Sequence, residues 1–282
     1  MKFGLFGINT GILQRPETIA RVARAAEAAG FESVWAPEHI VLPDPQVPPS
    51  PVPADTFLLD PSAALAFVAA HTERIRLGTG IIILPQRNPV ELAKELASVD
   101  VLSDGRLIFG LGVGYLESEY AALGMNFHDR GARADEYIDV LRALWTQESP
   151  AFSGRTVRFS GIDAQPRPVQ RPHPPIVVGG QSPAAFRRAV ARGNGWYGPA
   201  TPDTLPAVLE QIERAREEVD RPAELGDLEI GIMGMMDIDL EAALRYADLG
   251  VDRLTVLTQG ETEAEVIRAI EERGETIVRK LA

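Results

Sequence analysis

Short apolar segments alternate with amphipathic segments along almost the whole chain. Eight apolar segments have the length of strands buried on both faces, at 2–8, 32–39, 74–84, 106–114, 174–180, 195–200, 227–236 and 251–258. Each precedes a stretch with helical spacing of its apolar positions, at 16–31, 60–72, 88–103, 116–146, 182–193, 201–219, 240–250 and 262–273. The pattern therefore predicts eight strand–helix units.

Strict alternation of strands and helices leaves two architectures, an open doubly wound sheet and a closed (β/α)8 barrel. A count of eight units in 282 residues favours an α/β fold with one TIM-barrel domain over 1–282. Two stretches without periodicity, 40–58 and 147–173, are predicted to be long mobile loops. The first carries six prolines and leaves the carboxyl end of the second strand, where barrels place their active sites.

Charge and composition exclude several classes of function. The net charge is −12 and no basic cluster occurs, so neither a nucleic acid nor an anionic membrane surface is an expected partner. The absence of cysteine excludes disulfides, zinc–thiolate sites and a thiol nucleophile. No apolar run reaches the roughly 18 residues of a membrane span, and the first residues do not resemble a signal peptide. We expect a cytoplasmic protein.

Candidate chemistry lies where the predicted strands end. His39 follows Glu38 at the end of the second strand and could be a general acid or base, although a lone loop histidine can also cap a helix. In the third strand, Gly78 to Ile81 read Gly-Thr-Gly-Ile. Such glycines indicate either a bulge and close backbone approach, or small residues packing against a helix, and the residues alone leave both open.

Two glycine-rich turns follow later strands. Gly110 to Gly114 could expose backbone N–H groups to a phosphate or a ring edge, but the spacing differs from the dinucleotide-binding fingerprint. Gly179 to Ser182 precede a helix whose first turn could bind an anion, while Ser182 could equally be its N-cap. The four histidines are scattered and argue against a metal-centred hydrolase. We expect Met233, Met235 and Met236 to fill the barrel core.

Four stretches together resemble the bacterial luciferase-like family, and especially its branch that uses the deazaflavin coenzyme F420. They are "ARAAEAAGFESVWAPEH", "RIRLGTGIIILPQRNPVELAKELASVDVLSDGRLIFGLGVGY", "DRGARADEYIDVLRALW" and "PPIVVGGQSPAAFRRAVARGNGWYG". The resemblance covers the first two hundred residues in order. Beyond residue 200 it depends mainly on the barrel pattern.

This resemblance implies a (β/α)8 barrel that binds a flavin or deazaflavin at its carboxyl-terminal mouth. It implies a non-prolyl cis peptide behind the central ring of the cofactor, which falls at Gly80–Ile81 beside Thr79, with Ile81 against the ring face. Glu38 and His39 match an acidic residue–histidine pair in which the histidine lies near the reactive ring atom. The remaining positions match parts that surround the cofactor: the glycine turn (Gly112, Val113, Gly114), the phosphate loop (Gly179, Gly180, Gln181, Ser182) and a residue near the pyrimidine side in some relatives (Asn88).

One position departs from the resemblance. Relatives that oxidise sugar phosphates carry a glutamate one residue after the strand-four glycines, where this chain has Tyr115; Glu117 and Glu119 lie further on, in a predicted helix. This departure argues against sugar-phosphate oxidation. The resemblance implies a homodimer through helices two and three.

The leading hypothesis is F420-dependent hydride transfer to or from a small organic substrate. The alternatives are an FMN-dependent monooxygenase that receives reduced flavin from a separate reductase, and a flavin-binding barrel without catalysis.

Overall fold

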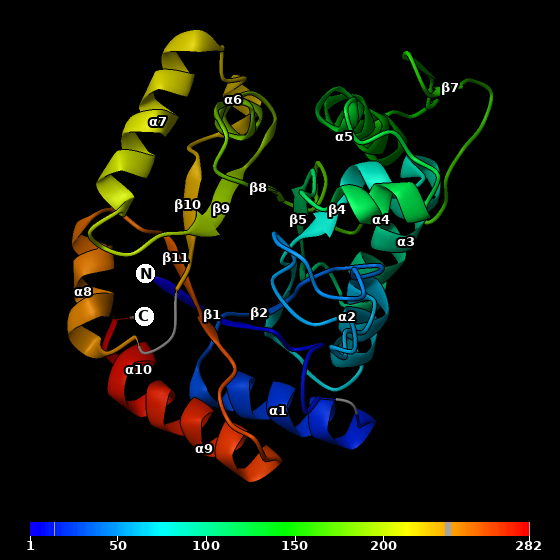
Figure 1. Cartoon of the computed structure of the whole chain (residues 1–282). Helices are drawn as coiled ribbons and strands as arrows, with labels where there is room; N and C mark the ends of the chain where they lie inside the picture. Colours follow the sequence, from blue (N-terminus) through cyan, green and yellow to red (C-terminus); the bar gives the residue numbers. More distant parts are fainter. Residues whose placement is uncertain (14, 235–237, 282) are drawn as a thin grey trace.

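Nine parallel strands form one sheet that closes on itself (Figure 1). The computed structural model describes residues 1–13, 15–234 and 238–281. Its parallel strands are β1 (Lys2–Phe6), β2 (Ser33–Ala36), β3 (Arg76–Thr79), β4 (Ile82–Ile83), β5 (Leu107–Gly112), β8 (Ile176–Gly179), β9 (Gly195–Pro199), β10 (Glu229–Met233) and β11 (Arg253–Leu257). They pair in the order β3-β2-β1-β11-β10-β9-β8-β5-β4, and a β3–β5 pairing closes the ring. β3 and β4 both pair with β5 and are two parts of one interrupted strand, so the nine strands occupy eight positions around the barrel. The predicted TIM barrel of eight strands is confirmed.

Helices surround the barrel on its outer face (Figure 1). The predicted helices appear as α1 (Pro16–Ala29), α2 (Pro61–Ala69), α3 (Pro89–Leu102), α4 (Glu117–Ala122), α5 (Arg130–Thr146), α6 (Pro183–Arg192), α7 (Leu205–Glu218), α8 (Leu240–Asp248) and α9 (Glu263–Arg273). The main hydrophobic core fills the layer between these helices and the strands. In the described ranges, no helix has both the length and the apolar character needed to cross a membrane.

The structure differs from the sequence-based prediction at three places. The helical stretch 116–146 is divided into α4 and α5, because Gly124 takes a left-handed φ of 66° just after α4. Within 147–173, β6 (Phe152–Ser153) and β7 (Arg158–Phe159) form an antiparallel hairpin that periodicity did not predict. A last turn, α10 (Arg279–Leu281), brings the chain end to the N-terminal amine, which donates a hydrogen bond to the Leu281 carbonyl at 3.1 Å.

Two stacked aromatic rings lie in the barrel interior, together with Ile108 and Val177. Trp35 of β2 stacks on Tyr197 of β9 with a centroid distance of 4.9 Å and an interplanar angle of 12°. Gly78 makes room for this stack, since a Cβ there would lie 2.5 Å from the Trp35 ring. Gly78 therefore serves packing, although its neighbour is a ring inside the barrel and not a helix.

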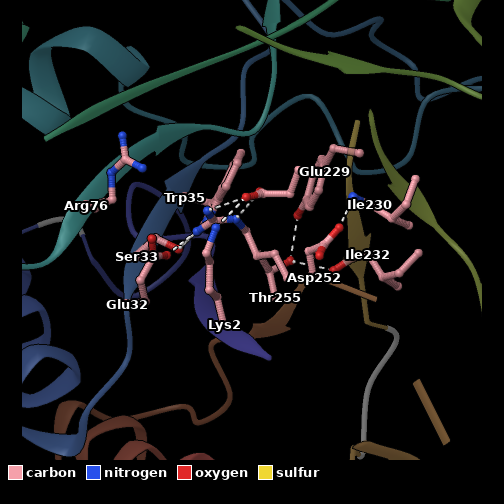
Figure 2. Close-up of polar contacts among 12 residues, drawn as sticks. Lys2, Glu32, Ser33, Trp35, Arg76, Glu229, Ile230, Ile232, Asp252 and Thr255 are labelled. Atoms are coloured by element: carbon pink, nitrogen blue, oxygen red, sulfur yellow. Dashed lines mark hydrogen bonds and ion pairs between the residues drawn. The ribbon is translucent and has the colours of Figure 1, made fainter. Parts of the chain in front are cut away.

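A buried cation closes the amino-terminal end of the barrel beneath this stack. Arg253 is 2% exposed and donates hydrogen bonds to Glu229 Oε1 at 3.0 Å, to Ser33 Oγ at 2.9 Å and to the carboxylate of Glu32. Figure 2 shows Glu229, from β10, converging with Ser33, from β2, and with Glu32 directly before it. Burial alone would raise the pKa of Glu229, but Arg253 and Lys2 hold it below its ordinary value.

The carboxylate of Glu27 connects α1 to the loop before β3 through hydrogen bonds. Its Oε1 accepts hydrogen bonds from three consecutive backbone N–H groups, those of Glu73, Arg74 and Ile75, at 2.6–3.0 Å. Partial burial would raise the pKa of Glu27, but these backbone donors lower it overall. A depressed folded-state pKa means that the carboxylate stabilises the fold above its unfolded-state pKa of about 4.3, and that this stabilisation is lost as the pH falls.

Replacement of Glu27 by Gln is therefore expected to lower the free energy of unfolding by about 1–2 kcal/mol near neutral pH. The difference from the native protein should shrink as the pH falls to about 3, because the native carboxylate is progressively protonated below its unfolded-state pKa. Urea denaturation of both proteins at neutral pH and at about pH 3 measures this difference in the free energy of unfolding. An equal difference at both would contradict the assignment of the effect to the ionised carboxylate.

Candidate active site

The interrupted strand formed by β3 and β4 contains a bulge at residues 79–81, within the segment that the sequence indicated. Gly78 pairs with Ile108, but Ile82 pairs with Leu111, so the three residues 79–81 lie opposite the two residues 109–110. The Thr79 hydroxyl spans the gap: it donates to the Gly110 carbonyl at 2.6 Å and accepts from the Gly110 N–H at 2.8 Å. The peptide between Gly80 and Ile81 is cis. The predicted bulge and the predicted non-prolyl cis peptide are both confirmed.

The bulge directs Ile81 across the mouth of the barrel. A Cβ on Gly112 would lie 2.0 Å from Ile81 Cδ1, and a Cβ on Gly179 would lie 3.1 Å from Ile81 Cγ2, so both glycines leave the space that this side chain occupies. Ile81 stays partly exposed, as do Phe6 and Met233, and all three pack on the cluster around Trp35 and Tyr197.

These side chains form an apolar floor that fits one face of a flat ring. Met233 thus contributes to the barrel interior as expected. Met235 and Met236 lie outside the described residues.

His39 stands at the wall of this mouth and is fixed by a buried carboxylate. Glu119 of α4 has no exposed surface, and its Oε2 lies 3.3 Å from His39 Nδ1. The other oxygen, Oε1, accepts the backbone N–H of Ile40 at 2.9 Å. The two carboxylate oxygens therefore hold both the imidazole and the chain that follows it.

These contacts determine which nitrogen of His39 carries the proton in the neutral ring. A carboxylate only accepts hydrogen bonds, so Nδ1 carries the proton and Nε2 has the free electron pair. The Tyr115 hydroxyl lies 3.4 Å from Nε2, and the two rings meet edge to face at 5.9 Å. Burial, and then the charge of Glu119, raise the pKa of Tyr115, so its phenol stays protonated at neutral pH. Glu119, His39 and Tyr115 thus form a hydrogen-bonded relay.

Glu38 has other partners than the relay, although it neighbours His39 in the sequence. Its Oε2 accepts the Ile83 N–H at 2.6 Å, and its Oε1 pairs with Arg87. Burial raises the pKa of Glu38, and Arg87 and the Ile83 N–H oppose that rise. Glu38 therefore fixes β4 and the segment after it, and in this structure it does not contact His39 through any described hydrogen bond.

A cavity of 420 Å³ opens beside His39 and Glu38, between the amino-terminal turns of α2 and α3. Asn88 lines it, but its Oδ1 is engaged as the N-cap of α3, accepting the Val90 N–H at 2.9 Å. Gln86 also lines it, and neither amide atom of this buried side chain has a partner within the described residues. The Gln86 amide is thus free to bind a polar group, a role that the sequence did not suggest.

The two predicted glycine turns lie at the same end of the barrel. Gly114 has a left-handed φ of 69°, and the preceding Val113 carbonyl accepts the Tyr120 hydroxyl at 2.6 Å. Gly180, Gln181 and Ser182 are exposed and precede α6, whose first turn the Ser182 hydroxyl caps by accepting the Ala185 N–H at 3.2 Å. Among the residues described, no backbone hydrogen bond uses the N–H groups of Gly180 to Ser182, and such donors at a helix start suit an anion.

Sequence reasoning did not single out Glu119. It lies two residues after Glu117 on a short helix, and nothing in its spacing separates it from an exposed helix acid. Its complete burial and its contacts to residues about eighty positions earlier are properties of the fold. The one available signal is the pair Glu119–Tyr120, which places two polar groups on the buried face of a predicted helix.

The profile of the luciferase-like monooxygenase family matches residues 1–279. The chain belongs to the luciferase-like monooxygenase family. An uncharacterized protein of Mycobacterium tuberculosis is 31% identical over 272 residues, which cover 86% of this chain and 96% of that protein. The FMNH2-dependent dimethylsulfone monooxygenase of Pseudomonas putida is 35% identical over 131 residues, or 45% of this chain and 36% of that protein.

Solved structures share the barrel. The monooxygenase RslO1 from Streptomyces bottropensis superposes with a TM-score of 0.79 at 23% identity, covering all of both chains. The coenzyme F420-dependent tetrahydromethanopterin reductase from Methanopyrus kandleri has a TM-score of 0.78 at 17% identity, covering 100% of this chain and 99% of that one. At these identities the likeness shows the barrel fold alone.

Proposed function

We propose that this luciferase-like protein is an F420-dependent oxidoreductase that transfers a hydride to or from a small organic substrate. The observation that carries the proposal is the relay of Glu119, His39 and Tyr115 at the edge of the apolar floor. Reduction or oxidation of an organic group by hydride needs a proton to be delivered or removed at the same place, and a fixed imidazole suits that role.

The residues at the mouth fit a flat, phosphate-bearing cofactor. The floor of Phe6, Ile81 and Met233 would contact one face of the ring, and the backbone donors of Gly180 to Ser182 would bind its phosphate. Gly112 and Gly179 would contribute by keeping Ile81 in place. When bound there, F420 supplies hydride chemistry and nothing else.

The protein's own part in the reaction is proton handling and exclusion of water. His39 Nε2 takes up or gives the substrate proton, while Glu119 keeps the ring orientation and stabilises the imidazolium that forms. Tyr115 is 49% exposed, so a substrate can displace its hydroxyl from His39. The loop 40–58, which begins at the exposed Ile40 and Val41, would cover the substrate.

Anaerobic mixing with oxidised F420 and a panel of alcohols, or with reduced F420 and a panel of ketones and enones, tests this proposal. Turnover of any member, followed by the cofactor's absorbance, supports it. Failure of tightly bound cofactor to react with every member would favour a barrel that binds without catalysis.

A second candidate is an FMN-dependent monooxygenase that receives reduced flavin from a separate reductase. The similarity to the Pseudomonas putida monooxygenase favours it. Oxygen uptake with reduced FMN that depends on an organic substrate would support this candidate over the first.

We also propose that the chain forms a homodimer through α2 and α3. Ala63 and Ala70 are exposed and Phe67 is half-buried along α2, while Val101 and Leu102 are exposed at the end of α3. Sedimentation equilibrium measures the assembly state, and a monomer at micromolar concentration would contradict this proposal.

A further inference from the structure

A second cavity lies at the opposite end of the barrel from His39. Its volume is 390 Å³, and its wall includes Pro175 and Asn194, the residues directly before β8 and β9. Since all barrel strands run parallel, these positions mark the amino-terminal end, whereas His39 follows the carboxyl end of β2. The amino-terminal end of such a barrel ordinarily serves stability.

Arg142 of α5 reaches this cavity with most of its donors unused. Its Nη2 donates to the Arg192 carbonyl at 2.7 Å, and its buried Nε has no partner within the described residues. No carboxylate of the described ranges forms an ion pair with it. Burial lowers the pKa of Arg142, and nearby Asp139 does not restore it. The guanidinium therefore lies in the cavity wall without an ion pair in the described ranges, although the charges of Asp139 and Glu224 offset part of the effect of its burial.

Two other arginines without an ion pair among the described residues differ from Arg142, because each donates hydrogen bonds to several oxygen atoms of the protein. Arg106 and Arg221 also lack an ion pair in the described part of the chain. Arg106 nevertheless donates to four oxygen atoms, and Arg221 donates to five. A cation without a carboxylate is thus stable here when carbonyl oxygens surround it. Arg142 has a single such oxygen and an open cavity beside it.

The connector before β8 adds a second cation. Arg171 lines the cavity, is exposed, and forms no ion pair among the residues described; its only acceptor there is the Pro168 carbonyl at 2.5 Å. His173 adds a ring whose Nδ1–H donates to the Pro174 carbonyl at 2.8 Å. Nε2 of the neutral ring is then an acceptor, so the ring lies beside a bound oxyanion without donating to it. Burial lowers the pKa of His173, so the positive charge at neutral pH comes from the arginines. One exposed carboxylate, Glu224, lines the same wall.

We propose that this cavity is a binding site for a small organic oxyanion, either a phosphate ester or a carboxylate. Two guanidinium groups from separate elements line it against one carboxylate, that of Glu224, so the lining carries a net positive charge in a chain whose net charge is −12. Guanidinium groups bind oxyanions through paired, charge-assisted hydrogen bonds. The site is separate from the phosphate loop at Gly179 to Ser182, and it does not depend on the proposed function.

Histidine NMR tests this site directly, because the chain has only four histidines. The full-length protein with isotope-labelled histidine is titrated with inorganic phosphate and, in a separate sample, with succinate. We expect a saturable shift of the His173 signal with at least one of the two anions, and the preferred anion identifies the source. A His39 shift without a His173 shift would place the anion at the barrel mouth and overturn the proposal.

Variants locate the bound anion. Arg142→Gln is expected to weaken binding by roughly 10–100-fold, the loss typical of one charge-assisted hydrogen-bonding group. Arg171→Gln, at an exposed position that the fold does not need, should weaken it several-fold. Arg268→Gln removes the same charge from the exposed face of α9 and should leave binding within about two-fold. Unchanged affinity in Arg171→Gln and Arg142→Gln, or no His173 shift with either anion, would overturn the proposal.

Discussion

Replacement of His39 by Ala is expected to lower the rate of hydride transfer by about 10²–10⁴-fold. In the proposed mechanism, Nε2 of His39 takes up or gives the substrate proton. Single-turnover mixing of F420-loaded protein with substrate measures the chemical step apart from product release. A rate unchanged from that of the native protein would exclude His39 from proton transfer.

Replacement of Glu119 by Gln separates positioning from proton transfer. An amide offers one acceptor oxygen, whereas the native carboxylate uses one oxygen for His39 and the other for the Ile40 N–H. We expect a smaller loss, about 10–100-fold, together with a displaced pH–rate profile and a nearly unchanged KM. A profile that keeps its native position would show that Glu119 serves stability alone.

Replacement of Arg253 by Met is expected to lower the free energy of unfolding by about 3 kcal/mol, at the lower end of the cost of removing one partner from a buried ion pair. The variant leaves Glu32 and Glu229 facing each other beneath Trp35 without their shared cation (Figure 2). Their side chains are 28% and 25% exposed, so water relieves part of the cost. Urea denaturation followed by circular dichroism measures the change.

Lys2 provides the matched control for that variant. It pairs with the same Glu229 carboxylate at 2.6 Å, but its side chain is 47% exposed. Lys2→Ala should therefore cost less than about 1 kcal/mol. If Arg253→Met costs no more than Lys2→Ala, the buried network does not stabilise the barrel.

The barrel could be predicted from the sequence because each of its strands and helices can be recognised from a short stretch of residues. Each strand and helix has its own pattern of apolar positions, and eight repetitions suffice to choose the closed architecture. The bulge was indicated by Gly78 to Ile81, and the resemblance to the luciferase-like family located the cis peptide within it. The break at Gly124 escaped prediction because the flanking segments are both helical.

The site was only partly predictable, because its decisive contacts are between distant residues. His39 and Glu38 are neighbours in the sequence, yet successive side chains of an extended segment point to opposite faces, and only His39 faces the relay. Glu119 approaches His39 across about eighty residues, and Arg253 meets Glu32 across more than two hundred. Such pairings follow from how the barrel closes, which no single stretch of sequence encodes.

Titration of the purified protein with oxidised F420 and with oxidised and reduced FMN, followed by fluorescence quenching, tests the central claim most directly. The account predicts that F420 binds with micromolar or tighter affinity and at least tenfold more tightly than FMN. It also predicts that Gly112→Val, which would drive a side chain into Ile81, weakens this binding while the fold persists. Selective binding of reduced FMN, or binding of neither cofactor, would contradict it.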